Sequence, residues 1–451
     1  MFKWKKYIVA GLAIVLMLTG IPVWAAEPAE TELFAKAAVL MDAESGRVLY
    51  EKNGQEIMAM ASTTKILTCI LALEQEDLEE WVEISAYAST MPKVKLGVKK
   101  GERYRLGDLL YSLMLESHND VAVAVAEHVG KEFLEKDLAQ KNASEYTVEE
   151  SKKAVAAFAD LMNEKAQELG CINSWFITPN GLDATETFYA KDGTTFTKEH
   201  ATTPEELARI MSYCVLHSPQ KEAFLRITQT ISHTFTSEKG RNHFCTNHNA
   251  FLSMMEGVIS GKTGFTNKAG YCYVGALERD GKTFVVALLA CGWPNNKSYK
   301  WSDSKKLMNY GIENFFKESI EDSQEEGRIP DEIPVINGQT LLLGQQAYVG
   351  VEVIATEQEG DFLLKSESVL LKKGEQVQFE YQLPTELKAP VRKGDVVGKL
   401  TYSVDGKIYR QKDIVLSEDV EEVNFRWCFE KVFGIYMGRS QGKESKNGVS
   451  G

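Results

Sequence analysis

The sequence lacks the residue spacings that mark zinc and thiol-exchange chemistry. It contains no Cys-x-x-Cys pair and no His-Glu-x-x-His motif, and its 7 cysteines and 7 histidines are scattered. Metal enzymes commonly carry their ligands at such fixed spacings. We therefore expect no metal in the mechanism and no other cofactor. Cysteines in apolar segments, such as Cys69 and Cys272, are expected to be small buried residues, and no disulfide is assigned.

The sequence also lacks an excess of positive charge. Its formal net charge is −13, whereas a protein that binds nucleic acid presents a basic face to the phosphates. Nucleic acid is therefore not an expected partner. No internal repeat is present either, so a solenoid is not indicated.

The N-terminal apolar run, Tyr7–Gly20, is shorter than the roughly 20 residues that span a bilayer. Lysines precede it, Pro22 ends it, and small residues follow at Ala25 and Ala26. This layout is typical of a secretory signal peptide over residues 1–26. The alternative is a retained membrane anchor, which fits a short run less well. The sequence thus predicts export.

The remaining length predicts two domains. Apolar periodicity indicates helices and strands in the first part and short alternating strands in the second. A long polar loop is expected at 180–203. Helices are expected at 61–75, twice within 106–129, at 151–169, from Pro204 and at 302–317, with strands at 35–53 and after Gly257. The predicted parts are a first domain at 27–317, a linker at 318–337, a β domain at 338–418, an amphipathic helix at 419–438 and a polar tail at 439–451.

The stretch "STTK" places a serine three residues before a lysine at the start of an apolar helical pattern. Ser62 and Lys65 therefore project from the same face of a helix. A serine hydroxyl becomes a good nucleophile when a base removes its proton. A lysine is such a base only where burial lowers its pKa. The motif is weak by itself, because Ser302 and Lys305 repeat it in a polar stretch.

The triplet "SHN" stands at the break between two apolar helical patterns. Ser117 or Asn119 could simply cap the second helix. In the functional interpretation Ser117 relays protons, while the amide of Asn119 fixes Lys65 and a substrate amide. The triplet alone leaves both interpretations open.

The stretch "GKTGFT" opens a strand-rich segment. Gly264 would let a substrate lie against the backbone of an edge strand. Lys262 and Thr263 would offer a cation and a hydroxyl to a carboxylate. The alternative is an ordinary exposed Lys-Thr pair before a turn.

In this order the three motifs resemble those of penicillin-binding proteins and serine β-lactamases. The segments "AAVLMDAESGRVLYEKN", "LMNEKAQELG", "TPNGLD" and "GKTGFTNKAGYC" are similar to the low-molecular-weight D-alanyl-D-alanine carboxypeptidases, the S11 peptidases. "APVRKGDVVGKL" resembles that family's C-terminal β domain. The resemblance implies an α+β fold of the β-lactamase/DD-peptidase type. Its antiparallel sheet would be flanked by helices, with a helical subdomain and a small all-β domain after it.

The resemblance also implies catalytic roles. Ser62 would be the acyl-ester nucleophile, Lys65 its general base and Ser117 the proton relay, with Asn119 beside them. The backbone N–H groups of Ser62 and Phe265 would form an oxyanion hole. The substrates would be peptidoglycan stem pentapeptides, from which water releases the terminal D-alanine after an acyl-enzyme forms, and β-lactams would inhibit covalently.

Substrate binding is implied for a second group of residues. The free carboxylate of the substrate would meet Lys262 and Thr263 beside Gly264, and Lys300 stands where relatives often carry a further basic residue. Phe265 departs from the histidine or tyrosine of many relatives, and the loop at 180–203 is longer than usual. Both departures put substrate preference in doubt.

Three alternatives share the same machinery or fold. A class A β-lactamase would carry an E-x-E-L-N-type loop, and no such pentapeptide lies between Asn119 and Lys262. A peptidoglycan endopeptidase remains open. A silent wall-binding relative would have lost one of the motifs, and none is lost.

The C-terminal segment 419–438 has one broad apolar face. Placed on a helix, its polar side carries Trp427 with the charged residues. The residues of the apolar face are Phe425, Cys428, Phe429, Val432, Phe433, Ile435 and Tyr436. The segment could pack on the β domain. Family resemblance favours a helix lying flat on the outer face of the cytoplasmic membrane, which would place the protein there or at the cell wall.

Overall fold

The computed structural model describes residues 26–189, 194–320, 329–355 and 366–437. The predicted signal peptide, apart from its last residue, and the predicted polar tail lie outside these ranges. The chain divides into two compact units, which are described separately. The first contains the residues up to Lys317 together with Leu370–Lys373, and the second contains Glu318–Val369 and the residues from Gly374 onward.

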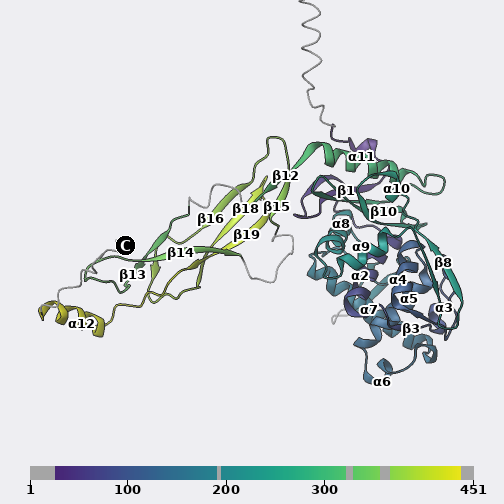
Figure 1. Cartoon of the computed structure of the whole chain (residues 1–451), viewed down its shortest axis with the longest axis horizontal. Helices are drawn as coiled ribbons and strands as arrows, with labels where there is room; N and C mark the ends of the chain where they lie inside the picture. The colour runs from purple at the N-terminus through teal and green to yellow at the C-terminus, as the bar shows by residue number, and fades with distance from the viewer. Residues whose placement is uncertain (1–25, 190–193, 321–328, 356–365, 438–451) are drawn as a thin grey trace, which may run out of the picture. The chain divides into compact units, whose positions relative to one another are not determined.

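A five-stranded antiparallel sheet in the order β2-β1-β11-β10-β9 forms the centre of the first unit (Figure 1). Its strands are β1 (Ala37–Asp42), β2 (Val48–Lys52), β9 (Val258–Thr266), β10 (Gly270–Arg279) and β11 (Lys282–Leu289). The predicted strands at 35–53 and after Gly257 are confirmed. Asp280 and Gly281 join β10 to β11 with positive φ angles of 54° and 70°, as a tight hairpin turn requires.

Both faces of this sheet are buried. Phe284, Val286 and Leu288 of β11 pack with Leu307 and Met308 of α11 (Tyr299–Asn314) in one apolar core. The helix α8 (Pro204–Ser212) packs against β1, β10 and β11, and Figure 1 shows the sheet between α8 and α11. Successive strand residues face opposite sides, so a sheet covered twice needs a continuous apolar run. The run "FVVALL" in β11 meets that need.

The helical part of the first unit confirms the helices predicted from apolar periodicity. The helix predicted at 151–169 begins earlier, because Thr147 and Glu150 form a reciprocal capping box. The longer helices are α2 (Lys65–Gln75), α4 (Leu106–Leu115), α5 (Asn119–Gly130), α7 (Val148–Glu168) and α9 (Lys221–Gln229). Short helices are α3 (Ala86–Ser89), α6 (Lys136–Ala139) and α10 (Phe251–Met254), with 3-10 turns at Glu30–Glu32, Ala61–Thr64, Lys131–Phe133 and Ala143–Glu145 and a π turn at Tyr213–His217.

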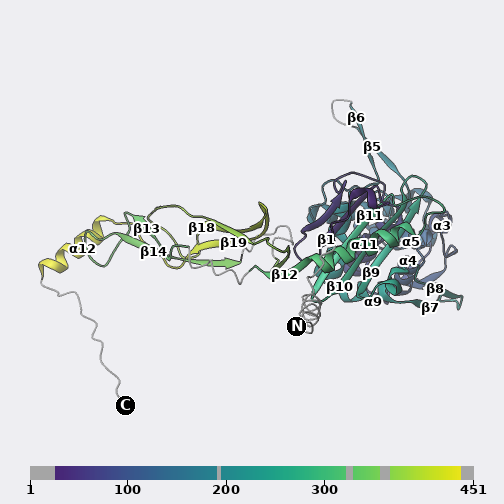
Figure 2. The same ribbon diagram turned by 90° about the horizontal axis from the view of Figure 1, so that it is seen from above.

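Three two-stranded antiparallel sheets also belong to the first unit. They pair β3 (Trp81–Glu83) with β4 (Arg103–Arg105), β5 (Thr185–Tyr189) with β6 (Thr195–Glu199), and β7 (Ser232–Thr236) with β8 (Asn242–Thr246). The second is a hairpin within 180–203, so part of the segment predicted as a long surface loop forms strands. Figure 2 shows it projecting from the unit. Its residues are mostly exposed, and the register rests on cross-strand pairs such as the stacked Phe188 and Phe196 rather than on a buried face.

The second unit holds a six-stranded sheet in the order β16-β18-β19-β14-β13-β17. Ile333, Val349 and Leu416 belong to its apolar core. The predicted linker at 318–337 includes β13, so this sheet begins earlier than expected. The strands from 315 onward are β12 (Phe315–Ser319), β13 (Glu332–Ile336), β14 (Ala347–Ala355), β15 (Ser368–Lys372), β16 (Gln378–Gln382), β17 (Leu387–Lys388), β18 (Val396–Val404) and β19 (Lys407–Leu416), followed by the helix α12 (Phe425–Tyr436).

Candidate active site

The three sequence motifs meet at one cavity of the first unit. Its volume is about 400 Å³, and Ser62, Ser117, Thr263 and Lys300 all contribute to its lining. Other hollows of this unit are as large, including one of about 480 Å³ beside His128. The lining of the first cavity, rather than its size, marks it as the candidate active site.

Ser62 and Lys65 lie side by side at the start of α2. Nζ of Lys65 is 2.9 Å from Oγ of Ser62, and it donates hydrogen bonds to Oδ1 of Asn119 at 3.0 Å and to the carbonyl oxygen of Asn180 at 2.6 Å. Oγ of Ser62 also accepts from Nζ, and its own hydroxyl donates to the carbonyl oxygen of Asn180 at 3.3 Å. A neutral amine has two N–H donors and one lone pair. When the amine is neutral, the two carbonyl oxygens can take both of its N–H donors, which leaves the lone pair for the hydroxyl of Ser62.

The surroundings of Lys65 favour that neutral form. The side chain is fully buried, and no carboxylate is within salt-bridge distance of its Nζ in the described chain. Burial first, and then the charge of Lys262, lower the pKa of Lys65 well below its usual range, against a weaker opposite effect of Asp120. Lys65 is therefore suited to accept a proton.

Ser117 and Lys262 form a second hydroxyl–amine pair. Nζ of Lys262 donates to Oγ of Ser117 and to the carbonyl oxygen of Thr263, both at 2.9 Å. Lys262 is 2% exposed, and burial lowers its pKa to about 7. Ser117 has a φ of +67°, a strained conformation for a residue other than glycine. The break between α4 and α5 thus holds this hydroxyl toward the cavity. We call Ser62, Lys65, Ser117 and Lys262 the reactive cluster.

Asn119 joins the two motifs and does not act as a helix cap. The residue before α5 makes no side-chain capping bond, so the capping interpretation of "SHN" is not supported. Instead Asn119 accepts from Lys65, and its backbone N–H donates to the carbonyl oxygen of Val94 at 2.8 Å. The adjacent Asp120, which the sequence analysis missed, accepts from the backbone N–H groups of residues 96–98. This carboxylate anchors the segment that borders the cavity.

Gly264 lies where the edge strand β9 meets the turn of Ser62. A Cβ atom at Gly264 would lie 2.9 Å from the backbone nitrogen of Ser62 and 3.0 Å from Cβ of Ala61. Only glycine allows this approach. The next residue, Phe265, lines the cavity and is 38% exposed. Because β9 ends the sheet, some of its backbone groups have no strand partner and are available to a ligand.

Lys300 belongs to the opposite side of the cavity. Its Nζ lies 4.8 Å from the ring centre of Tyr271 and 4.5 Å from that of Trp301, and it donates to the carbonyl oxygen of Lys297 at 2.6 Å. Burial first, and then the charge of Lys297, lower its pKa to about 8. We call Tyr271, Lys297, Lys300 and Trp301 the outer wall. All of them line the cavity, whereas Lys262 lies beneath its lining.

The segment "TPNGLD" contributes to the site through its backbone. The carbonyl oxygen of Asn180 accepts the shortest hydrogen bond of Lys65. Gly181 has a φ of +82°, and a Cβ atom there would lie 2.0 Å from the carbonyl oxygen of Ala61. The sequence analysis placed these residues at the start of a surface loop. The Asn-Gly pair, which favours a tight turn, was the available signal.

His200 ties this segment to the turn of Ser62 and was also missed. The backbone N–H groups of Ile177 and Thr178 donate to its Nδ1 at 3.0 and 3.4 Å, so Nε2 carries the proton and donates to Oγ1 of Thr64 at 2.8 Å. The hydroxyl of Thr64 in turn donates to the carbonyl oxygen of Ala61. Burial, and then the charge of Lys65, lower the pKa of His200 to about 3, so the ring stays neutral.

The Peptidase_S11 family, described as D-alanyl-D-alanine carboxypeptidase, matches residues 24–144 and 148–290 of this sequence. The chain belongs to this S11 family. The C-terminal domain of penicillin-binding protein 5 matches residues 360–422. The predicted family and the predicted α+β fold with a following β domain are therefore confirmed.

Individual proteins are similar to this chain over part or most of its length. The D-alanyl-D-alanine carboxypeptidase DacF of Bacillus subtilis (strain 168) is 24% identical over 413 residues, which cover 89% of each chain. The crystal structure of penicillin-binding protein 5 from Haemophilus influenzae covers 88% of this chain and 100% of its own, at 25% identity and a TM-score of 0.61. The D-alanyl-D-alanine endopeptidase of Pseudomonas aeruginosa is 27% identical over 249 residues, covering 55% of this chain and 68% of that protein.

Proposed function

We propose that the chain is a serine-type D-alanyl-D-alanine carboxypeptidase that removes the terminal D-alanine from peptidoglycan stem pentapeptides. Membership of the S11 family supports the reaction, and Ser62 is the proposed nucleophile. One observation carries the assignment of that residue. The amine of Lys65 lies 2.9 Å from Oγ of Ser62, and the oxygens of Asn119 and Asn180 are placed to accept both of its N–H donors when it is neutral.

Acylation follows from the reactive cluster. Neutral Lys65 takes the proton of Ser62 as Oγ attacks the carbonyl carbon between the two D-alanines. The backbone N–H groups of Ser62 and Phe265 stabilise the oxyanion. Ser117 delivers a proton to the leaving amine and takes one from the ammonium of Lys262, 2.9 Å from its hydroxyl, so acylation leaves Lys65 protonated and Lys262 neutral. Water then attacks the ester and gives a proton to Lys262 through Ser117, while Lys65 returns its proton to Oγ of Ser62.

Recognition of the terminal carboxylate involves both sides of the cavity. The sequence analysis gave this role to Lys262 and Thr263. The bond of Lys262 to Ser117 and its position outside the cavity lining favour a part in proton transfer instead. Burial does not separate the two lysines, because Lys262 is 2% exposed and Lys300 is 1% exposed. The hydroxyl of Thr263 and the ammonium of Lys300 both line the cavity and are the better partners for a carboxylate.

Incubation with a stem pentapeptide, followed by mass spectrometry, tests the reaction. We expect loss of one D-alanine and formation of the tetrapeptide, with no reaction in Ser62→Ala. A β-lactam should add covalently to a peptide containing residues 62–65 and not to that variant. An adduct that forms undiminished in Ser62→Ala would contradict the assigned nucleophile.

Two further outcomes distinguish related activities. Cleavage of a crosslinked muropeptide dimer faster than of the pentapeptide would indicate an endopeptidase, as the Pseudomonas relative is named. Rapid hydrolysis of the penicilloyl adduct would indicate a β-lactamase. We expect the adduct to be long-lived.

We further propose that the protein is exported and that α12 rests on the outer face of the cytoplasmic membrane. No residue of α12 is buried, and Phe425, Phe429 and Tyr436 are 85%, 58% and 85% exposed. The side chain of Lys431 bonds the carbonyl oxygen of Leu341, which begins an exposed run of three leucines. These apolar groups suit a lipid interface. No helix in the described residues is long and apolar enough to cross a membrane.

Truncation after Ser417 tests the membrane proposal. We expect the truncated protein to leave the membrane fraction and keep its activity on small peptides. Phe429→Ser together with Phe433→Ser should act in the same direction in the full chain. A truncated protein that still sediments with membranes after cleavage of its signal peptide would count against α12.

A further inference from the structure

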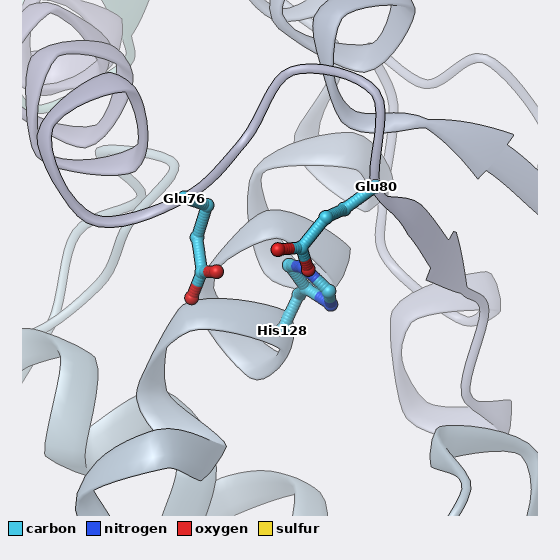
Figure 3. A group of neighbouring side chains, drawn as sticks. All are labelled: Glu76, Glu80 and His128. Atoms are coloured by element: carbon cyan, nitrogen blue, oxygen red, sulfur yellow. The ribbon is translucent and has the colours of Figure 1, made fainter.

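Two carboxylates and one imidazole meet at the end of α2 and α5, away from the cavity. Glu76 directly follows α2, Glu80 directly precedes β3, and His128 lies in the last turn of α5. Figure 3 shows the three side chains turned toward one another. One carboxylate oxygen from each glutamate and one ring nitrogen lie within 4.8 Å of each other. It is the only such group of three in the part of the chain that the structure describes.

The imidazole of His128 is buried and incompletely satisfied. The residue is 8% exposed, and its Nε2 makes no hydrogen bond to any described residue. Oε2 of Glu80 is 3.2 Å from this nitrogen, but the geometry is not that of a hydrogen bond. Native structures seldom leave a buried polar atom in this state without an unrecorded water or ion.

The donor atoms, and the separation of one pair of them, suit zinc. Zinc binds histidine nitrogen and carboxylate oxygen at about 2.0–2.2 Å in a tetrahedron, so neighbouring donor atoms stand about 3.3 Å apart. The 3.2 Å between His128 and Glu80 is close to that separation. A divalent cation would also offset the electrostatic repulsion between the carboxylates of Glu76 and Glu80. The nearby Lys131 is paired with Glu132 at 3.6 Å.

We propose that Glu76, Glu80 and His128 form a structural zinc site, with water as the fourth ligand. The ion would join the end of α2, the turn before β3 and the end of α5. These two helices begin with Lys65 and Asn119, whose side chains meet at 3.0 Å. An ion at the far ends of both helices would hold them in register. The 11 residues of α2 span about 16 Å, so the ion would touch no reacting atom.

Zinc titration of the purified protein tests the proposal. After chelation and dialysis, isothermal calorimetry with zinc alone should give one ion per chain, and zinc should raise the midpoint of thermal unfolding. Cobalt in place of zinc should produce the visible absorption of a four-coordinate ion. Covalent labelling by penicillin should persist in the chelated protein, because the site lies outside the cavity.

Glu76→Gln and Glu80→Gln are the informative variants, because they keep the side-chain volume at positions that are not buried. Each should weaken zinc binding by at least about tenfold, the smallest loss expected even for a residue that only supports a ligand. Glu79→Gln is the matched control: its carboxylate is 81% exposed and lies 3.8 Å from Arg105. Unchanged affinity in both ligand variants, or no zinc binding by the parent protein, would overturn the proposal. Loss of penicillin labelling on chelation would contradict a purely structural role.

Discussion

The reactive cluster and the outer wall hold their lysines in different ways, although both belong to one cavity. Lys65, Lys262 and Lys300 are all buried, but Lys65 and Lys262 of the reactive cluster each lie 2.9 Å from a serine hydroxyl. In the outer wall, Lys300 lies above two aromatic rings and lines the cavity. The first environment favours an amine that exchanges protons, and the second favours a cation that binds an anion. Residue type alone does not distinguish these roles.

The largest expected effect is that of Lys65→Arg. Guanidinium stays protonated in proteins, so it cannot accept the proton of Ser62. We expect the rate of penicillin acylation to fall about 10²- to 10⁴-fold. Stopped-flow measurement of adduct formation checks this. Lys300→Arg is the control from the outer wall and should keep most of its acylation rate, because it retains a charge. Equal losses in the two variants would remove the distinction between the regions.

Gly264→Ala should give the next largest loss. Its Cβ atom would lie 2.9 Å from the nitrogen of Ser62 and would push β9 away from the proposed oxyanion hole. Loss of one such donor costs about 10²- to 10³-fold in rate. Gly107→Ala is the control, since its Cβ atom would meet only atoms of Leu78, at 3.4 Å or more. Acylation of Gly264→Ala at the parent rate, with the fold intact, would show that this approach is not needed.

Loss of the charge of Lys300 at high pH should weaken substrate binding. Its pKa is about 8, so the side chain is charged below that pH and becomes neutral above it. The KM for a peptide with a free terminal carboxylate should therefore rise above about pH 8. Lys300→Arg should shift this rise to higher pH, and Lys300→Gln should raise KM about 10- to 100-fold at pH 7. The KM for a peptide with a terminal amide should not rise in this way. If both peptides respond alike, Lys300 does not bind the carboxylate.

The smallest effect is expected for His200, which acts through the segment that carries Asn180. His200→Ala removes the bonds to Thr64 and to the backbone of Ile177, so Lys65 should be held less firmly. We expect acylation to slow about two- to tenfold, in keeping with the modest net contribution of such bonds. His233→Ala, which removes a 2.7 Å contact with Asp108 outside the cavity lining, should leave the rate unchanged. An unaltered rate in His200→Ala would limit that histidine to stability.

The fold was predictable where local pattern and tertiary packing agree. The apolar patterns at 35–53 and after Gly257 predicted the strands of the central sheet. The hairpin of β5 and β6 was not predicted, because its side chains are mostly exposed and no apolar alternation marks it. The strand β13 was assigned to the predicted linker, because an acidic, proline-containing stretch precedes it.

The candidate site was predictable from residues that carry chemistry in their side chains. Ser62, Lys65, Ser117, Lys262 and Thr263 were chosen from three motifs, and the structure brings them to one cavity. Their catalytic roles stay predictions. Asp120, Asn180 and His200, which support the site, were not found, because a carbonyl group such as that of Asn180 has no signature in residue type.

The sequence by itself determined the motifs, their order and the family, because these depend on residue identity along the chain. Tertiary structure alone decided which lysine is buried against a hydroxyl and which one lines the cavity, because burial and partner atoms arise only when distant segments meet. It also brought Glu76, Glu80 and His128 together from two separate stretches, with no spacing in the chain to indicate it. The pKa of an amine and the affinity of a metal site depend on that arrangement in space.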